Sequence, residues 1–196
     1  LYKQMMVNHC DIHLIEQHTE HGPFIIDIDL RFNIDLKTRQ YSVDFIKKIC
    51  EVYQKNIIEY FENPNVLCFV FERPSPYLYK HKANGVDSAI MKDGIHLMFP
   101  YIVSSPAVQK IIRENIIKEL EEIGLFKTIP TNNTIYDAID KLVIDQVGWY
   151  MYGSTKENVA RYELTYVINS SLEIISKTNY NEYELPKFLS IRNQSN

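Results

Sequence analysis

Two acidic residues interrupt an apolar segment near the N-terminus. Residues 23–32 are apolar except for Asp27, Asp29 and Arg31, and the segment has the composition of a buried strand. Residues two apart on a strand project from the same face, so the two carboxylates lie close together, where they repel each other and are costly to bury. A divalent cation removes both problems, and carboxylate oxygens suit Mg²⁺ or Mn²⁺, which proteins commonly hold together with substrate phosphates. The spacing therefore predicts metal-assisted phosphate chemistry.

This pair of acids is compatible with several kinds of enzyme. Two-metal nucleases, glycosyltransferases and polymerases all use carboxylates at such spacing. A structural role, in which one acid caps a turn or pairs with Arg31, is disfavoured because both acids lie inside the apolar segment. Arg31 continues the alternation, so we expect it on the face of the acids, where it neutralises them or contacts a phosphate.

A histidine enters a second predicted strand, residues 95–99, two positions after a glycine. Gly94 permits close approach of a backbone or a ligand. His96 alternates with apolar neighbours and therefore faces away from the core, and Lys92 lies four residues upstream. These two side chains are suited to donating hydrogen bonds to a triphosphate. The alternative is a structural histidine, which is the commoner role of a lone histidine.

A third carboxylate is followed by an aromatic segment and a small polar turn. Asp140 lies among apolar residues, residues 149–152 are mostly aromatic, and Ser154 and Lys156 belong to the turn at residues 153–156. The backbone N–H groups of such a turn can cradle phosphates, with the lysine ammonium beside them. An ordinary exposed turn is the alternative.

The remaining pattern predicts the elements that position these residues. Strands are expected at residues 66–72 and 162–168, and amphipathic helices at 41–61 and from the Ser105-Pro106 start to a cap at Gly124. A short helix is expected at residues 134–142, a loop at 77–92 and irregular structure at 1–22, and the segment from 171 onward is weakly patterned. This order of elements predicts an α/β or α+β fold with helices packed on a sheet.

Composition restricts the class of protein. The 196 residues carry a net charge of −4, from 21 Lys and Arg against 25 Asp and Glu, which disfavours a pure nucleic-acid-binding module. No apolar run approaches the roughly 20 residues of a membrane span, so no membrane partner is expected. The chain begins at Leu1, which suggests a single domain, residues 1–196, taken from a longer protein.

The cysteines and histidines form no standard metal site. The three cysteines are far apart and odd in number, which indicates a reducing compartment rather than a disulfide or zinc framework. A cluster near the N-terminus has spacings that match no standard zinc site, and an exposed loop or a short edge strand is expected there; its members are His9, Cys10, His13, His18 and His21.

Taken in order, the three motifs resemble the core of the archaeo-eukaryotic primase superfamily, in particular the primase domain of poxvirus-type primase–helicases from nucleocytoplasmic large DNA viruses. The resemblance covers about residues 20–160 and extends to the end of the domain near residues 185–192. It implies a primase catalytic core with mixed sheets, flanking helices and an RRM-like catalytic module. It also implies synthesis of primers on single-stranded DNA during viral replication.

The resemblance assigns Asp27, Asp29 and Asp140 to the binding of two Mg²⁺ or Mn²⁺ ions. Asp145 is the rival for the third position, and Asp140 is preferred because its spacing to Trp149 and the following turn fits the family better. In the implied mechanism one metal lowers the pKa of the 3′-hydroxyl, and the other holds the triphosphate and the leaving pyrophosphate.

The resemblance assigns the binding of the incoming nucleoside triphosphate to five further residues: His96, Lys92, Lys156, Ser154 and Arg31. Many members of the superfamily have serine where Gly94 stands and an arginine near Tyr150. One phosphate contact is therefore expected to be missing, or to come from Arg31 or Arg73.

The implied partners are a single-stranded DNA template, nucleoside triphosphates and a hexameric helicase domain in the same longer chain, and the implied location is the host cytoplasm. Two other functions remain open. A metal-dependent 3′–5′ exonuclease also begins with carboxylates on a strand, but it needs no triphosphate-binding lysine and histidine. A non-catalytic single-strand-binding module of a replication protein would use the 14 tyrosines and 9 phenylalanines for stacking.

Overall fold

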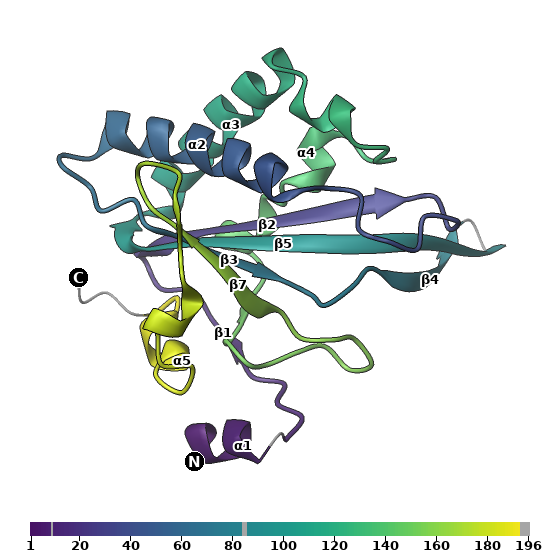
Figure 1. The fold of residues 1–196 in the computed structure, drawn as a ribbon, viewed down its shortest axis with the longest axis horizontal. Coiled ribbons are helices and arrows are strands. Elements are labelled where there is room, and N and C mark those ends of the chain that lie inside the picture. The colour runs from purple at the N-terminus through teal and green to yellow at the C-terminus, as the bar shows by residue number, and fades with distance from the viewer. Residues whose placement is uncertain (9, 84–85, 193–196) are drawn as a thin grey trace.

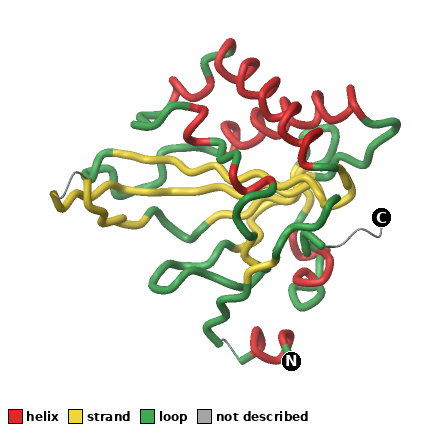
Figure 2. Tube along the Cα trace, turned by 180° about the vertical axis from the view of Figure 1, so that it is seen from behind, coloured by secondary structure: helices red, strands yellow, loops and turns green. Residues whose placement is uncertain are grey.

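A computed structural model describes residues 1–8, 10–83 and 86–192. A six-stranded sheet has the order β2-β5-β3-β7-β8, with β4 added beside β5, and a second sheet pairs β1 with β6. Figure 1 shows the two long helices, α2 and α3, on one side of the large sheet, with α1 and α5 on the other side. Figure 2 shows the same layers from behind. Every strand pair in the described ranges is antiparallel. The resemblance implied mixed sheets, and these ranges contain no parallel pair.

The elements have the following bounds. The helices are α1 (Tyr2–Val7), α2 (Val43–Tyr60), α3 (Pro106–Glu122), α4 (Ile135–Ala138) and α5 (Leu185–Phe188), with 3₁₀ turns at Leu125–Thr128, Leu142–Ile144 and Lys177–Asn179. The strands are β1 (Ile15–Glu16), β2 (Gly22–Phe32), β3 (Cys68–Glu72), β4 (Tyr77–Ala83), β5 (Val86–Ser104), β6 (Trp149–Tyr150), β7 (Glu163–Ile168) and β8 (Ile174–Ile175).

The alternation along β2 separates the core from the polar face. Ile26, Ile28 and Leu30 are buried in the main core, which α2 and α3 complete. Asp27 and Asp29 project from the opposite face, as the period of two predicts. A second apolar cluster lies on that opposite face, away from the acids, and includes Ile25 of β2. The fold therefore places the two acids on a sheet face that α2 and α3 do not cover.

Local signals explain where the two long helices begin and end. The Ser42 hydroxyl accepts a hydrogen bond from the backbone N–H of Phe45, which caps α2. Pro106 begins α3 at its first position, and Gly124 follows its end with φ of +67°, a conformation that favours glycine. The predicted long helices are confirmed within two residues at each end.

Two predictions of local structure are wrong. Where the structure describes it, the expected loop at residues 77–92 is β4 together with the first part of β5; residues 84–85 lie outside the described ranges. Lysines and the nearby Pro74 and Pro76 indicated a loop, but pairing between distant segments extends the sheet there. The N-terminal segment, expected to be irregular with an exposed loop or a short edge strand, contains the unpredicted helix α1 as well as the short strand β1. Strand β1 is held by pairing with β6, in which Glu16 lies opposite Trp149, 133 residues later.

The predicted helix at residues 134–142 is divided. It contains α4, and the 3₁₀ turn Leu142–Ile144 follows after a short break. The break occurs because the backbone N–H of Asp140 donates to the carbonyl of Asp27, 2.9 Å away, instead of continuing the helix. Within the described ranges, no helix has the length and apolarity needed to cross a membrane.

Candidate active site

The pairing of β2 with β5 brings the first two motifs together. Asp27 lies opposite His96, and Asp29 lies opposite Gly94. The His96 Nε2 atom is 3.4 Å from Asp27 Oδ1, and the Lys92 Nζ atom is 2.9 Å from Asp29 Oδ2. Two carboxylates, an imidazole and an ammonium group therefore share one patch of the sheet.

The third carboxylate reaches this patch through the chain that follows α4. Ile139 forms an antiparallel bridge with Ile28, and the next residue, Asp140, hydrogen-bonds the backbone of Asp27. The buried Arg113 of α3 fixes this segment by donating from Nε to the carbonyl oxygen of Ile139 at 3.0 Å. Asp140 is consequently placed beside the β2 acids.

Asp145, the rival third carboxylate, lies elsewhere. Its Oδ2 atom is 2.5 Å from the Lys110 Nζ atom on α3. It does not line the cleft that contains Asp27, Asp29 and Asp140. The geometry therefore favours Asp140 over Asp145 as the companion of the β2 acids.

A cleft of about 380 Å³ contains most of the residues that the sequence singled out. Those on its wall are Asp27, Asp29, Lys92, His96, Asp140, Ser154 and Lys156. Arg31 does not line the cleft; it is exposed further along β2, opposite Lys92 in the strand register. The arginine on the cleft wall is Arg73.

The turn at residues 153–156 is fastened to the N-terminal segment. The buried Ser154 hydroxyl accepts from the backbone N–H of Leu14 at 3.2 Å and lies 3.2 Å from the Tyr2 hydroxyl. The backbone N–H of Thr155 donates to the carbonyl of Ile12. Ser154 thus fixes the turn, and Lys156 is left exposed at the edge of the cleft.

The histidine cluster predicted as an exposed loop supports the same region. His13 Nδ1 lies 2.7 Å from the carbonyl oxygen of Thr155, and His18 Nε2 lies 2.8 Å from that of Val147. His9 lies outside the described residues. These contacts hold the N-terminal segment against the chain that forms the cleft.

Sequence reasoning missed the aromatic wall of the cleft. The His96 ring stacks on Tyr162 with centroids 3.5 Å apart and also contacts Trp149 at 4.4 Å. The Arg73 guanidinium lies 3.9 Å from the Tyr162 ring centroid, and its Nη1 donates to the Tyr162 hydroxyl at 2.7 Å. The sequence had already named Arg73, as an alternative to Arg31 for a phosphate contact, whereas no local signal marked Tyr162.

Gly94 lies directly against this wall. A Cβ atom at Gly94 would lie 2.1 Å from the Tyr162 hydroxyl oxygen, which is closer than real contacts allow. The close approach expected at this glycine is therefore made by Tyr162. Because Tyr162 also contacts His96 and Arg73, a side chain at position 94 would displace the cleft wall.

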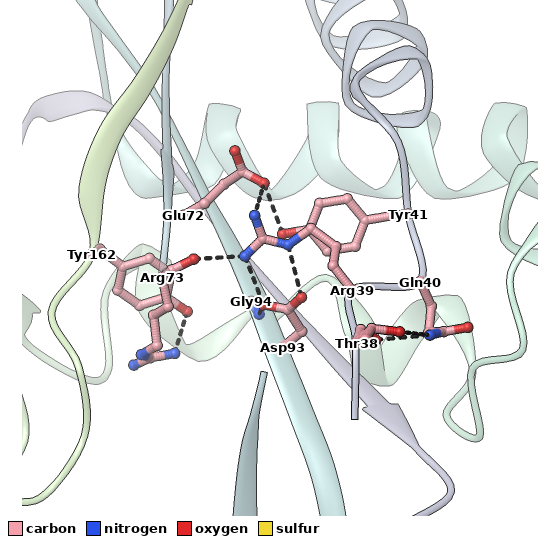
Figure 3. A network of polar contacts seen from close by, with 9 residues as sticks. All are labelled: Thr38, Arg39, Gln40, Tyr41, Glu72, Arg73, Asp93, Gly94 and Tyr162. Carbon is pink, nitrogen blue, oxygen red and sulfur yellow. Dashed lines mark hydrogen bonds and ion pairs between the residues drawn. The ribbon is translucent and has the colours of Figure 1, made fainter. Parts of the chain in front are cut away.

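A largely buried ionic network links Arg39 to the strands that carry Arg73 and Gly94 (Figure 3). Arg39 pairs with Asp93 at 3.0 Å and with Glu72 at 2.8 Å, and it donates to the carbonyl of Arg73 at 2.6 Å. Asp93 and Glu72 are almost completely buried. The Tyr41 hydroxyl donates to Glu72, and burial, Asp93 and Glu72 raise the pKa of Tyr41. The network joins the C-terminal end of β3, which Arg73 follows, to the middle of β5, where Gly94 lies next to Asp93.

Burial and neighbouring charges shift the pKa values of two groups in the cleft. Burial, followed by the charges of Asp29 and Asp140, raises the pKa of Asp27 to about 7. Burial, together with Arg73 and Lys156, holds the pKa of His96 well below its usual value. At neutral pH His96 is therefore uncharged, and it does not compensate the acids.

One observation indicates that these residues fit a divalent cation. Asp27 Oδ1 is buried and has no hydrogen-bond partner, so an acceptor is present without a donor. In the described part of the chain, no three Asp, Glu, His or Cys side chains converge closely enough to form a complete metal site. A cation here would need oxygens from substrate phosphates and water, which is the usual coordination of Mg²⁺.

The raised pKa of Asp27 predicts an unusual dependence of stability on pH in the absence of metal. The folded chain holds the Asp27 proton more tightly than the unfolded chain, because the pKa rises from 3.8 to about 7. Ionising this group therefore lowers the free energy of unfolding, by about 1.4 kcal/mol per pH unit, as the pH rises from about 4 to about 7.

The measurement is urea unfolding of wild type and Asp27→Asn in EDTA across this range. The stability of the variant relative to wild type should increase with pH. A difference that stays constant with pH would contradict the prediction.

One family model and two viral proteins are similar to this chain. The model of the C962R protein N-terminal AEP domain matches residues 1–168. A protein of Acanthamoeba polyphaga mimivirus, provisionally named helicase L207/L206, is 29% identical over 99% of this chain and 18% of its own length. A protein of Invertebrate iridescent virus 6, provisionally named helicase 184R, is 25% identical over 97% of this chain and 23% of its own length.

The chain thus spans about a fifth of the length of these two relatives. The family match covers most of the chain and confirms both the resemblance and the fold class that the motifs indicated. The chain belongs to the family of the C962R N-terminal domain, which is of the archaeo-eukaryotic primase type.

Proposed function

We propose that this domain is a DNA-dependent primase-polymerase that synthesises primers on single-stranded DNA by two-metal nucleotidyl transfer during viral DNA replication. The observation that carries the proposal is the gathering of Asp27, Asp29 and Asp140 in one cleft with cationic side chains. Carboxylates for metal ions and cations for phosphates are both needed to bind a metal–triphosphate complex.

The three carboxylates are the proposed ligands of two Mg²⁺ or Mn²⁺ ions. When bound, such ions lower the pKa of the attacking 3′-hydroxyl and neutralise charge on the triphosphate. In the structure Lys92 forms an ion pair with Asp29. An Asp29 carboxylate that binds a cation no longer needs this partner, so the Lys92 ammonium is released to contact a phosphate.

The remaining cleft residues bind and orient the triphosphate. Because His96 is uncharged at neutral pH, it acts as a hydrogen-bonding partner, and positive charge comes from Lys92, Lys156 and Arg73. These groups stabilise negative charge as it develops on the phosphates. Ser154 holds in place the turn that carries Lys156. In the proposed complex the backbone of this turn lies near the phosphates. Arg31 lies outside the cleft, so Arg73 instead makes the phosphate contact that was expected from one of these two arginines.

We further propose that the domain is joined to a helicase domain in a longer chain, because both relatives carry helicase names and are about five times its length. A hexameric helicase and replication in the host cytoplasm complete this proposal.

The proposal is tested by incubating the chain with single-stranded template, nucleoside triphosphates and Mn²⁺ or Mg²⁺. We expect new strands that require template and metal, with each nucleotide set tested separately. Shortening of a labelled strand would instead identify a 3′–5′ exonuclease. Strand binding without any growth or shortening, and without affinity for nucleotides, would identify a non-catalytic binding module.

Asp140 and Asp145 provide a matched pair of variants. Asp140→Asn removes a cleft carboxylate and should reduce strand synthesis by at least about a hundredfold, since one lost metal contact costs several kcal/mol in the transition state. Asp145→Asn removes the same charge from the pair with Lys110 and should retain wild-type synthesis. The measurement is the initial rate of strand growth for both variants, and the reverse order of activities would contradict the assignment.

A further inference from the structure

The hairpin of β4 and β5 carries a row of rings on the face of the sheet that forms the cleft. The register pairs three residues of β4 with three of β5: Tyr77 with Lys92, Tyr79 with Ile90, and His81 with Ser88. Directly paired residues, and residues two apart on a strand, share a face. Lys92 contacts Asp29 in the cleft, so the row begins at the cleft and leads away from it.

Contacts along the row confirm that it is continuous. Tyr77 lines the cleft, and the Lys92 ammonium lies 5.1 Å from the centroid of the Tyr79 ring. The rings of Tyr79 and His81 are nearly parallel, with centroids 5.7 Å apart and an angle of 12°. Figures 1 and 2 show the paired ends of β4 and β5 reaching past the helices that cover the other face.

The row is accessible and lacks acidic side chains. Tyr79 is 43% exposed, and Arg31 is exposed beside Lys92 in the strand register. The described hairpin residues on this face, at positions 77, 79, 81, 88, 90 and 92, include no carboxylate. His81 Nδ1 is shielded from solvent and has no hydrogen-bond partner. This surface therefore differs from the chain as a whole, which has a net charge of −4.

We propose that this row is the surface on which single-stranded template lies as it runs to the cleft. Bases stack on Tyr77, Tyr79 and His81, and the phosphates lie near Lys92 and Arg31. Proteins bind single strands by this combination of aromatic platforms and cationic grooves. The inference rests on the proposed function, because a templated synthesis requires a strand that reaches the carboxylates.

The test is binding of a fluorescent single-stranded oligonucleotide, measured by anisotropy in EDTA without nucleotides. Tyr79→Ala should weaken binding roughly 5- to 100-fold, the usual effect of losing one stacking ring, and Tyr79→Phe should bind like wild type. Leu78→Ala is the matched control, since Leu78 is 46% exposed and lies on the opposite face of the same strand. With an abasic oligonucleotide, Tyr79→Ala and wild type should bind equally.

An equal loss in Tyr79→Ala and Leu78→Ala, or a loss that persists with the abasic strand, would overturn the inference. Strand synthesis by the wild-type chain separates this result from the proposed function. If wild type extends strands while Tyr79→Ala binds normally, this surface is wrong and the proposed function stands. If Tyr79→Ala weakens binding while wild type never extends a strand, the surface stands and the proposed function fails.

Discussion

Replacing Asp27 with asparagine should reduce strand synthesis by at least about a thousandfold while the chain stays folded. The Asp27 carboxylate is repelled by the charges of Asp29 and Asp140. One of its oxygens is buried and has no hydrogen-bond partner. Asparagine keeps the shape but removes the charge that would bind a cation, and metal ions supply several kcal/mol of transition-state stabilisation. The measurement is the rate of templated nucleotide addition, with circular dichroism and thermal unfolding as the check on folding.

Asp35→Asn is the control for the loss of one negative charge. Asp35 is exposed in the loop after β2 and does not line the cleft, so this variant should retain wild-type synthesis. Asp27→Asn should be at least as stable as wild type at neutral pH, because the repulsion among the three carboxylates is reduced. A folded Asp27→Asn chain with a rate near wild type would refute the catalytic assignment.

Replacing Arg39 with methionine should lower the free energy of unfolding by about 3–5 kcal/mol. Methionine retains much of the side-chain length but leaves Asp93 and Glu72 buried without their cation. Buried charges that lose a partner are far costlier than exposed ones. The measurement is urea-induced unfolding of Arg39→Met and of the wild-type chain at pH 7.

Lys48→Met is the matched control for Arg39→Met. Lys48 pairs with Glu51 at 2.7 Å, and both side chains are more than two-fifths exposed. Exposed ion pairs contribute about 0–1 kcal/mol, so this variant should unfold almost like wild type. Similar small losses in both variants would show that the network of Figure 3 is not the stabilising contact described here.

The sequence predicted the elements whose signals are local. The period of two in β2 placed Asp27 and Asp29 on one face, and the amphipathic pattern with Pro106 and Gly124 located the long helices. These features depend on neighbouring residues, so a single sequence contains the needed information.

Features that depend on distant pairing were not predictable in the same way. The hairpin of β4 was mistaken for a loop because its strand character comes from pairing with β5. Arg73 and Tyr162 are brought to His96 by the order of strands in the sheet, which no local pattern specified. Arg31 was expected beside the acids, and it does lie on their face of β2. It is not part of the cleft wall, because β2 extends beyond the cleft.

The most direct test of the account is a crystal structure of the chain with Mn²⁺ and a non-hydrolysable nucleoside triphosphate. We predict anomalous peaks about 2.0–2.2 Å from oxygens of Asp27 and Asp29, with Asp140 beside them and the Lys92 ammonium on a phosphate. Mn²⁺ bound elsewhere, with Lys92 still paired to Asp29 and no ion at Asp27 Oδ1, would contradict the central claim.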